Sequence, residues 1–316
     1  MKKTKNIIID CFGNDLGYQT IIKGVELILN QLKDISITLV GDSSLIKPII
    51  DESLLSRINF INATTEISNN DCIIKAIYDK KDASVLLGLK ELSENNSSIG
   101  MISFGNSGAL LMGCLRYLKV NNVRPCMGAL LPTINDKYVL LVDAGSTNDC
   151  DAHQIQEFAH LGSSFMKDTY GISSPKVALL SNGSESNKGN KVTKETYALL
   201  KEDQSINFIG NIEANNIFNG EVDVIAGDGF IINQVIKTIE GTGKLLINEI
   251  ISYTNDSSLG KHLLLKYDLV NLGGGVFLGV KKPVIKLRGN GQEKALLSGA
   301  KILLNIHNKT DLYKEI

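Results

Sequence analysis

The sequence predicts an α/β fold in which helices cover both faces of a mostly parallel sheet. Short runs of β-branched and other apolar residues recur along the chain, and each is followed by a loop of small residues and a segment with helical spacing. Continuous apolar strands that alternate with helices are typical of a parallel sheet buried on both faces. The chain has 316 residues, 43% apolar and 21% charged, so it has the composition of a globular protein and can bury a large core.

The apolar runs locate the strands, and the polar residues after them locate the helices. The predicted strands cover residues 6–10, 35–41, 99–104, 138–143, 176–181, 207–210 and 222–226. Asn, Ser or Asp residues at the junctions can cap free N–H groups, which predicts helices over 109–118, 152–167, 191–201 and from 229 towards 253. We expect a single domain over residues 1–316. Ligands of such sheets bind outside the carboxyl ends of the strands, so the loops there form the candidate site.

Charge and cysteine content narrow the class of protein. Lys plus Arg is 33 and Asp plus Glu is 34, a net charge of −1, so no overall positive field would recruit nucleic acid. The five cysteines form no C-x-x-C pair, which indicates reduced thiols, a cytoplasmic location and no structural zinc. The apolar run after the basic N-terminus is too short for a signal peptide, and no apolar stretch reaches about 18 residues. We therefore expect membrane contact to be peripheral at most.

The loop F-G-N-S-G-A-L at residues 104–110 lies between a predicted strand and a predicted helix. Its glycines let the backbone approach a ligand closely, and the helix start offers N–H donors to an anion. Asn106, Ser107 and Gly108 are therefore candidate phosphate-binding residues. A tight turn closed by a helix cap explains the same residues, and this loop alone leaves both interpretations open.

Two further loops carry an aspartate at a strand end. In D-A-G-S-T-N-D-C, residues 143–150, Asp143 could orient a nucleophile or hold a metal. We expect Cys150 to pack as a small apolar residue, because no neighbour in the sequence would lower its pKa. In A-G-D-G-F-I-I-N, residues 226–233, Asp228 lies between two glycines and is either a site residue or an ordinary turn aspartate.

The loop L-S-N-G-S-E-S-N-K-G-N at residues 180–190 carries one cation, Lys188, at the entrance to a helix. The ammonium and the first N–H groups of the helix could meet one phosphate, so Lys188, Gly189 and Asn190 are candidate phosphate-binding residues. The loop does not match the Walker motif, and a solvated surface loop is the alternative. The chain has no G-x-S-x-G or H-E-x-x-H motif, which disfavours serine-hydrolase and zinc chemistry.

Nine segments, taken in order, resemble the bacterial acyl-[acyl carrier protein]:phosphate acyltransferases, the PlsX family. They are I-D-C-F-G-N-D at 9–15, I-T-L-V-G-D at 37–42, K-K-D-A-S at 80–84, G-N-S-G-A-L at 105–110, L-P-T at 131–133, D-A-G-S-T-N-D-C at 143–150, G-S-E-S-N-K-G-N at 183–190, F-I-G-N-I-E-A at 208–214 and D-G-F-I-I-N at 228–233. Each segment is short, but all of them in one order are specific.

The resemblance implies a Rossmann-like three-layer α/β/α fold, similar to isocitrate and isopropylmalate dehydrogenases and to phosphotransacetylases. It also implies a homodimer that moves a long acyl chain from acyl carrier protein to inorganic phosphate, giving acyl phosphate for phospholipid synthesis through a glycerol-3-phosphate acyltransferase. No metal and no cofactor are expected. We assign catalysis to Lys188, Asp228, Asn233 and Asp143, phosphate binding to Asn106, Ser107, Gly108, Lys188, Gly189 and Asn190, and the cleft to Asp10, Gly13, Asp15, Glu185 and Arg288.

The chain departs from the family pattern at several positions. Leu16 and Arg288 stand where the family has histidines, and the segment 249–272 is shorter than the family's helical pair. Asn14, Thr147 and Ile231-Ile232 replace other family residues. Two alternatives stay open: a phosphotransacetylase-like enzyme that uses a coenzyme A thioester, and a non-catalytic relative that binds acyl carrier protein. A dehydrogenase of the related fold, which needs a divalent metal, is disfavoured.

Overall fold

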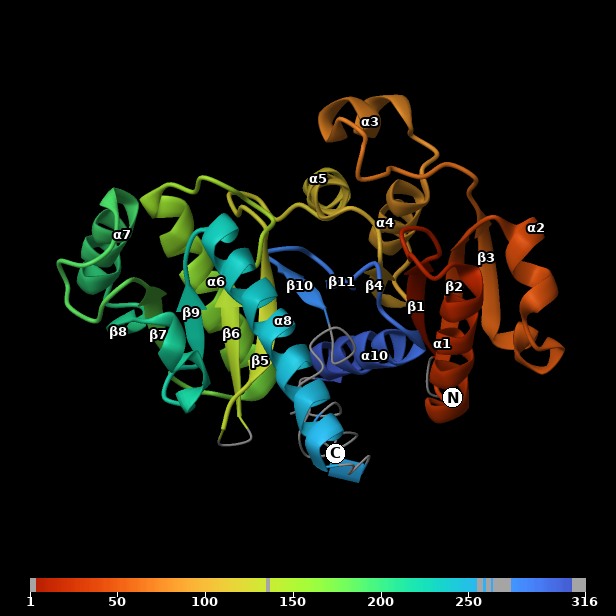
Figure 1. Cartoon of the computed structure of the whole chain (residues 1–316). Coiled ribbons are helices and arrows are strands. Elements are labelled where there is room, and N and C mark those ends of the chain that lie inside the picture. The colour runs from red at the N-terminus through yellow and green to blue at the C-terminus, as the bar shows by residue number, and fades with distance from the viewer. Residues whose placement is uncertain (1–3, 135–136, 255–257, 260–262, 264–273, 309–316) are drawn as a thin grey trace. The chain divides into compact units, whose positions relative to one another are not determined.

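A computed structural model describes residues 4–134, 137–254, 258–259, 263 and 274–308 (Figure 1). The chain divides into two compact units, one formed by Met1–Pro125 with Gly273–Asn308 and the other mainly by Cys126–Leu272. We call them unit 1 and unit 2 and describe each by itself. The single domain expected over residues 1–316 stays a prediction. The segment 249–272, where a shortened helical excursion is expected, lies mostly outside the described residues after Thr254.

Unit 1 contains a mostly parallel sheet in the order β3-β2-β1-β4-β11-β10. Among the described strands of unit 1, β10 alone runs antiparallel, against β11. The strands are β1 (Lys5–Asp10), β2 (Ile35–Gly41), β3 (Ile58–Asn62), β4 (Ser98–Ser103), β10 (Gly275–Leu278) and β11 (Val284–Lys286). The carboxyl ends of β1, β4 and β11 therefore lie side by side at one edge of this sheet.

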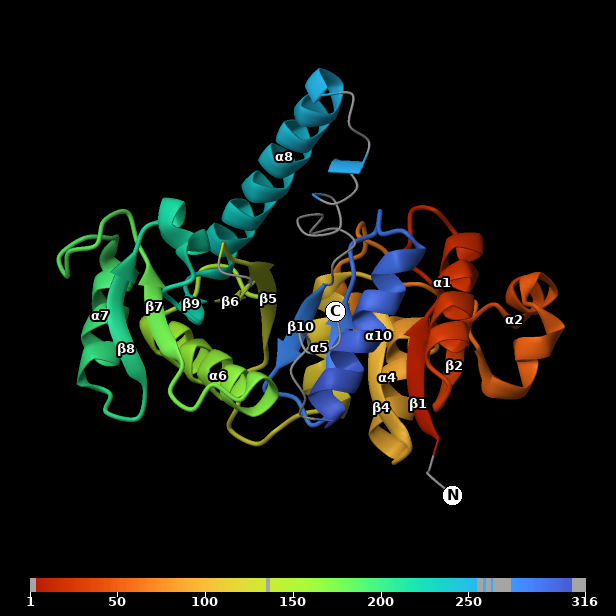
Figure 2. The ribbon, with the colours of Figure 1, turned by 90° about the horizontal axis from the view of Figure 1, so that it is seen from below.

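Helices cover both faces of the unit 1 sheet. A Cβ on Gly100 would meet Leu303 of α10 (Glu293–Asn308), whereas the neighbouring Met101 contacts Gly88 of α4 (Ser84–Glu94). Successive residues of a strand face opposite sides, so α10 and α4 lie on different faces. Helix α1 (Tyr18–Gln31) packs beside α10, and α5 (Ser107–Tyr117) packs beside α4 (Figure 2). The shorter helices are α2 (Ser43–Ile46), α3 (Ile73–Asp79), η1 (Lys47–Ile49) and η2 (Glu52–Arg57).

The strands of unit 2 lie in the order β5-β6-β9-β7-β8. Its strands are β5 (Cys126–Pro132), β6 (Tyr138–Val142), β7 (Lys176–Leu180), β8 (Asn207–Ile212) and β9 (Val224–Ala226), and only β5 runs antiparallel to its neighbour. The helices are α6 (Ala152–Tyr170), α7 (Lys191–Glu202), α8 (Gly229–Thr254) and η3 (Ala214–Asn219). Gly162 of α6 packs directly on Val224 and Val142 of the sheet.

Local signals in the sequence define the ends of α6. Asp151 and Gln154 form a capping box at its start, and Gly171, with φ 71°, ends it in a left-handed conformation. The side chains of Asn106 and Asn190 cap the first turns of α5 and α7, as the sequence predicts.

The predicted α/β fold with a mostly parallel sheet is confirmed. All predicted strands and helices occur, with ends that differ by a few residues. The sequence analysis missed β3, β5, β10 and β11. Strands β10 and β11 have only 4 and 3 residues, too few for a clear pattern, and β5 contains Gly128 and ends at Pro132. No helix within the described ranges is long and apolar enough to cross a membrane.

Candidate active site

Each unit gathers loops at the carboxyl edge of its sheet. The unit 1 loop cluster comprises residues 11–17 after β1, 104–108 after β4 and 287–291 after β11. The unit 2 loop cluster comprises residues 143–151 after β6, 181–190 after β7 and 227–233 after β9. Every site residue predicted from the sequence lies in or directly beside one of these two clusters.

Asp10 anchors the unit 1 loop cluster. Its carboxylate is buried and accepts hydrogen bonds from the Ser103 hydroxyl at 2.8 Å and from the Phe12 N–H at 3.2 Å. The same Ser103 oxygen accepts the N–H of Gly105 at 2.9 Å. Burial raises the pKa of Asp10 to about 6. Asp10 therefore holds the loop after β1 directly and the loop after β4 through Ser103. The sequence analysis did not single out Ser103.

The loop at residues 11–17 packs closely on its neighbours. A Cβ on Gly13, which has φ +79°, would lie 2.6 Å from the Cα and N atoms of Gly105, so this contact needs a glycine. The Asp15 N–H donates to the Gly289 carbonyl at 2.8 Å, and the Asn14 side chain donates to the Gly291 carbonyl at 3.0 Å. The structure thus brings the predicted residues Asp10, Gly13 and Asp15 together with the loop that contains Arg288.

Asn14 and Leu16 show how two departures from the family pattern fit the loop. The Asn14 side-chain oxygen accepts the Leu16 N–H at 2.8 Å, so Asn14 fixes the turn and ties it to residue 291. The Leu16 side chain is 52% exposed. Leu16 therefore occupies an open position, and no contact of the apolar core depends on it.

Asn106 is the N-cap residue of α5, and both polar groups of its side chain already form hydrogen bonds. Its side-chain oxygen accepts the Ala109 N–H at 3.1 Å, and its amide donates to Asn69 at 2.9 Å. Helix geometry leaves the backbone N–H groups of Ser107 and Gly108 as the donors available to an anion. The predicted phosphate-binding residues 106–108 thus form a helix start whose backbone, rather than the Asn106 side chain, can bind an anion.

Lys286 lies directly beside the unit 1 loop cluster, and the sequence analysis did not single it out. It is the last residue of β11, and its ammonium donates to the Phe104 carbonyl at 3.1 Å and to the Leu287 carbonyl. Burial lowers the pKa of Lys286 to about 8. The lysine follows two apolar residues inside a short strand, so no glycine-rich or polar pattern marked it.

Asp143 organises the unit 2 loop cluster. Its side chain is completely buried and accepts hydrogen bonds from the N–H groups of Met127 at 2.9 Å and Thr147 at 2.6 Å. The N–H and hydroxyl of Ser146 also donate to it, at 3.2 Å and 2.8 Å. Burial raises the pKa of Asp143 despite these donors. Its hydrogen bonds with described residues come from backbone N–H groups and from Ser146, which fits a carboxylate that holds a loop.

Asp228 and Asn233 lie against the Asp143 loop. Asp228 accepts the Cys150 N–H at 2.8 Å and the Phe230 N–H at 2.9 Å, so it joins the start of α6 to the start of α8. A Cβ on Gly145 would lie 3.0 Å from Asn233. Gly229 leaves even less room, because its Cβ would lie 2.1 Å from the Thr147 carbonyl oxygen. The structure therefore brings together Asp143, Asp228 and Asn233.

Cys150 is buried in this cluster and its thiol lies 3.6 Å from the Thr147 carbonyl oxygen. Burial raises the pKa of Cys150 to about 12. A thiol with that pKa is not a thiolate at neutral pH, which agrees with the small apolar role expected from the sequence.

The loop at residues 181–190 is folded on itself around Gly183. A Cβ on Gly183 would meet the Lys188 side chain at 2.7 Å and the Glu185 carboxylate at 3.0 Å. The Gly189 N–H donates to the Asn182 side chain at 2.8 Å, and Asn190 caps α7 by accepting the Thr193 N–H at 2.9 Å. Lys188 is exposed, and no ion pair is formed by it with any described residue.

Some of the predicted site residues belong to unit 1 and the others to unit 2. Unit 1 holds Asp10, Gly13, Asp15, Asn106, Ser107, Gly108 and Arg288, and unit 2 holds Asp143, Glu185, Lys188, Gly189, Asn190, Asp228 and Asn233. In unit 2, the loops after β7 and β9 are neighbours, because a Cβ on Gly227 would lie 3.4 Å from the Leu180 Cβ. No group of three described His, Cys, Asp or Glu side chains is arranged to hold a metal ion.

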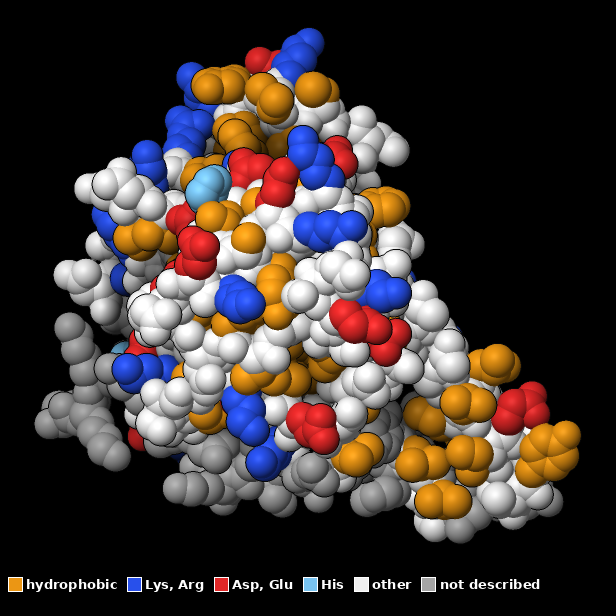
Figure 3. Space-filling model, turned by 90° about the vertical axis from the view of Figure 1, so that its left-hand side faces the viewer, with side chains coloured by type: hydrophobic (Ala, Val, Ile, Leu, Met, Phe, Trp, Pro, Cys, Tyr) orange, Lys and Arg blue, Asp and Glu red, His pale blue; other side chains and the backbone are white. Residues whose placement is uncertain are grey.

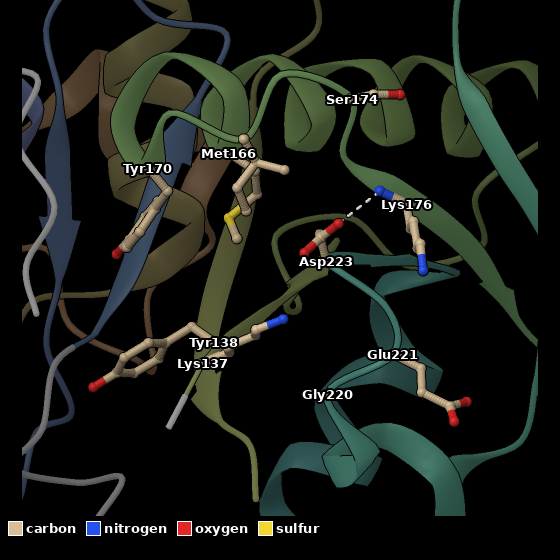
Figure 4. A pocket seen from close by; sticks show the side chains of 10 residues that line it. Lys137, Tyr138, Met166, Tyr170, Ser174, Lys176, Gly220, Glu221 and Asp223 are labelled. Carbon is tan, nitrogen blue, oxygen red and sulfur yellow. Dashed lines mark hydrogen bonds between the residues drawn. The ribbon is translucent and has the colours of Figure 1, made fainter. Parts of the chain in front are cut away.

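A cavity of about 450 Å³ lies at the other edge of the unit 2 sheet (Figure 4). Tyr138 and Lys176, which line it, begin β6 and β7, and Asp223 precedes β9. The Asp223 carboxylate accepts the Lys176 N–H at 2.7 Å. None of the residues predicted to act at the site lines this cavity, so it is separate from the unit 2 loop cluster.

Solved structures define the class of fold. The chain is similar to the EutD phosphotransacetylase from Staphylococcus aureus, with 15% identity and a TM-score of 0.62 over 96% of this chain and 94% of that one. It is also similar to 4-hydroxythreonine-4-phosphate dehydrogenase from Klebsiella pneumoniae, with 11% identity and a TM-score of 0.57 over 96% and 99% of the chains. The α/β fold is therefore that of the phosphotransacetylases and related dehydrogenases, as the sequence predicted.

Sequence comparison identifies the family within this class. Residues 5–308 match the family described as "Fatty acid synthesis protein". A phosphate acyltransferase of Streptococcus pneumoniae (strain ATCC 700669 / Spain 23F-1) is 38% identical over 93% of this chain and 92% of its own length, and the strain JJA protein matches equally well. The chain belongs to the phosphate acyltransferase, or PlsX, family, which confirms the resemblance found from the motifs.

Proposed function

We propose that this protein is an acyltransferase that moves an acyl group from a carrier thioester to inorganic phosphate. The observation that carries the proposal is the 38% identity to phosphate acyltransferases along nearly the whole chain. The structure supports it locally, because several of the family motifs form loops at the carboxyl ends of strands in each unit, where ligands of this fold class bind.

In this reaction a phosphate oxygen attacks the thioester carbonyl carbon. A carbon–oxygen bond forms, the carbon–sulfur bond breaks, and the thiolate takes up the proton that hydrogen phosphate releases. The products are acyl phosphate and the free carrier thiol. Such a step needs donors that hold phosphate in line with the carbonyl and donors for the oxyanion that develops on it.

The predicted site residues fit these needs in two ways. In unit 1, the N–H groups of Ser107 and Gly108 are our candidate donors for phosphate. In unit 2, Lys188 is our candidate cation for it. Asp143 and Asp228 accept hydrogen bonds from the backbone of their own loops, which supports a positioning role for both. Within unit 2, Asn233 lies beside Gly145 of the Asp143 loop, and Glu185 lies beside Gly183 of the loop that carries Lys188.

We propose acyl carrier protein as the acyl donor and acyl phosphate for phospholipid synthesis as the product. A coenzyme A thioester is the competing donor. The two are separated by measuring thiol release from palmitoyl-acyl carrier protein and from palmitoyl-coenzyme A at equal concentrations. Faster release from the carrier protein supports the proposal, and a clear preference for coenzyme A contradicts it.

A non-catalytic relative that binds acyl carrier protein is the second candidate. Leu16 favours it, because a leucine where the family has histidine can neither transfer a proton nor hold an anion. This candidate predicts binding of the carrier protein without any thiol release. We also propose a homodimer, which sedimentation of the purified chain would test.

Peripheral membrane contact has one specific observation in its favour. The second half of α8 carries Leu245, Leu246, Ile250 and Tyr253 with exposed fractions of 60%, 56%, 37% and 84%. Figure 3 shows orange apolar side chains gathered on this end of the helix. Exposed apolar patches of this kind mark surfaces that contact proteins or membranes, and we propose a lipid surface as the partner.

A further inference from the structure

Lys286 completes a row of polar residues across three strands of unit 1. The register pairs Asp10 with Ser103 and Ser103 with Lys286, so one residue at the carboxyl end of each strand lies in the row. Residues paired in this way point to the same face of a parallel sheet. The row therefore places an ammonium, a hydroxyl and a carboxylate directly below the loop at residues 104–108.

Lys286 and Ser103, the middle member of the row, hold the peptide bond between Phe104 and Gly105 from both of its polar sides. Lys286 donates to the Phe104 carbonyl oxygen at 3.1 Å. The Gly105 N–H donates to the Ser103 hydroxyl at 2.9 Å, and that hydroxyl donates to Asp10 at 2.8 Å. Gly13 packs against the same peptide, so nothing larger than a hydrogen fits between the two loops.

This peptide bond lies two residues before Ser107, the first residue of α5. Lys286 and Ser103 therefore hold the chain that leads into α5, whose first turn carries the Ser107 and Gly108 N–H groups. Lys286 also adds a positive charge on the same side of the sheet. Burial lowers the pKa of Lys286 to about 8, and the nearby cation Arg288 also lowers it. The carboxylates of Asp10 and Asp15 act in the opposite direction and raise it.

We propose that Lys286 is a positioning residue for phosphate, which holds the Phe104–Gly105 peptide so that the start of α5 can bind the anion. The inference rests on the proposed function, since it takes phosphate as the substrate bound at residues 106–108. Lys286 acts through this peptide and does not itself contact phosphate. The expected consequence is a loss of phosphate affinity that leaves affinity for the acyl donor unchanged.

Lys282 provides a matched control on the same chain segment. It lies four residues earlier and also donates to two backbone carbonyls, those of Leu92 at 2.9 Å and Asn95 at 2.8 Å. Burial lowers its pKa as well. These carbonyls belong to the end of α4 and to the residue that follows it, away from the unit 1 loop cluster. Losing either lysine removes similar bonds, but only Lys286 adjoins the proposed phosphate site.

The test compares Lys286→Met, Lys286→Arg and Lys282→Met with the unchanged protein. We expect Lys286→Met to raise the phosphate KM at least tenfold while the KM for palmitoyl-acyl carrier protein changes less than twofold, Lys286→Arg to recover most of the loss, and Lys282→Met to keep the phosphate KM. An unchanged phosphate KM in Lys286→Met, or an equal rise in Lys282→Met, overturns the inference. If Lys286→Met does not fold, Lys286→Gln is measured against the same expectations.

Calorimetric titration with inorganic phosphate separates this inference from the proposed function. If the unchanged protein binds phosphate but transfers no acyl group, the proposed function fails, and the inference is judged by the phosphate affinity of Lys286→Met, which should be at least tenfold weaker. If the unchanged protein binds no phosphate, or if Lys286→Met binds it equally well, the inference is wrong.

Discussion

Lys188 is the residue on which the proposed phosphate site depends most directly. It is exposed, and it is the one cation within the loop at residues 181–190. Lys188→Ala should raise the phosphate KM tenfold or more, equivalent to at least about 1.4 kcal/mol, because the variant removes the charge that attracts the anion. Steady-state kinetics with varied phosphate measure this.

Lys191→Ala is the control for Lys188→Ala. Lys191 lies three residues further along and is 3.9 Å from Glu195 on the exposed side of α7. The control should leave the phosphate KM unchanged. Equal phosphate dependence in Lys188→Ala and the unchanged protein would remove Lys188 from the site.

Asp10 predicts a pH dependence of stability at the residue scale. Its pKa is raised by burial from 3.8 to about 6, so the protonated form favours the folded state. The resulting stabilisation is fully present below pH 3.8 and is lost as the pH rises through about 6. Asp10→Asn stays neutral, so it should gain free energy of unfolding relative to the unchanged protein between pH 4 and pH 7, on the order of 3 kcal/mol.

Urea unfolding at pH 4 and pH 7 measures the Asp10 effect. Asp168→Asn, an exposed substitution on α6, is the control and should show little change in the same comparison. If the free energies of unfolding of Asp10→Asn and the unchanged protein differ by the same amount at both pH values, burial does not raise the pKa of Asp10.

The contact between α6 and the turn after α7 depends on Asp203. One carboxylate oxygen accepts the Ser205 N–H at 3.0 Å, and the other accepts the Gln156 amide at 3.0 Å and lies 2.7 Å from His160 Nε2. The hydrogen bond from the Ser205 hydroxyl, at 2.6 Å, is the main cause that lowers the pKa of Asp203. The carboxylate therefore stabilises the folded chain above pH 3.8, and this contribution is lost as the pH falls further.

Asp203→Ala should lower the free energy of unfolding at pH 7 by about 1–3 kcal/mol, because it leaves the partners on α6 without their acceptor. Glu202→Ala, an exposed neighbour, should change it by less than about 0.5 kcal/mol. Urea unfolding of both variants gives the comparison. Equal losses in the two variants would show that Asp203 does not join these elements.

Helix α8 carries the proposed membrane contact. Replacing Leu245 and Leu246 together by Glu should weaken sedimentation with phospholipid vesicles at least tenfold, because burying a leucine contributes about 1.5–3 kcal/mol. The double variant Leu45→Glu, Ile49→Glu is the control, since these residues of unit 1 are also exposed, at 55% and 38%. Vesicle binding that is lost equally in both variants, or in neither, would contradict the proposed contact.

Prediction from sequence succeeded where a local pattern determines the structure. Runs such as residues 35–41 are buried and continuous, so both the strands and the parallel sheet followed from them. Strands β10 and β11 were not predicted, because 4 and 3 residues are too few to show a periodicity. Their place in the sheet depends on long-range pairing. Asp228 stood out between two glycines at a strand end, whereas Asp10 and Gly13 followed from the resemblance to the family.

Lys286 and Ser103 were not predicted for a physical reason. Both are the last residues of strands, and their roles come from register across β1, β4 and β11 rather than from neighbours in the sequence. The sequence likewise gave no indication that Asp143 would be fully buried with its acceptors used by local donors. Loop chemistry can thus be predicted from motifs, whereas the groups beneath the loops require the sheet order.

At the scale of the whole molecule, family membership and the two loop clusters support one reaction. The family identity predicts acyl transfer to phosphate, and Leu16 is the residue that challenges it, since it occupies a position where the family has histidine. Its side chain is 52% exposed in a loop that Asn14 holds in place. The fold therefore accommodates the leucine.

The most direct measurement is thiol release from palmitoyl-acyl carrier protein by the purified chain, with and without phosphate, while hydroxylamine traps any acyl phosphate. We predict release that requires phosphate and yields palmitoyl hydroxamate in an amount equal to the thiol. No release, with binding of the carrier protein retained, would contradict the acyltransferase and favour the non-catalytic relative.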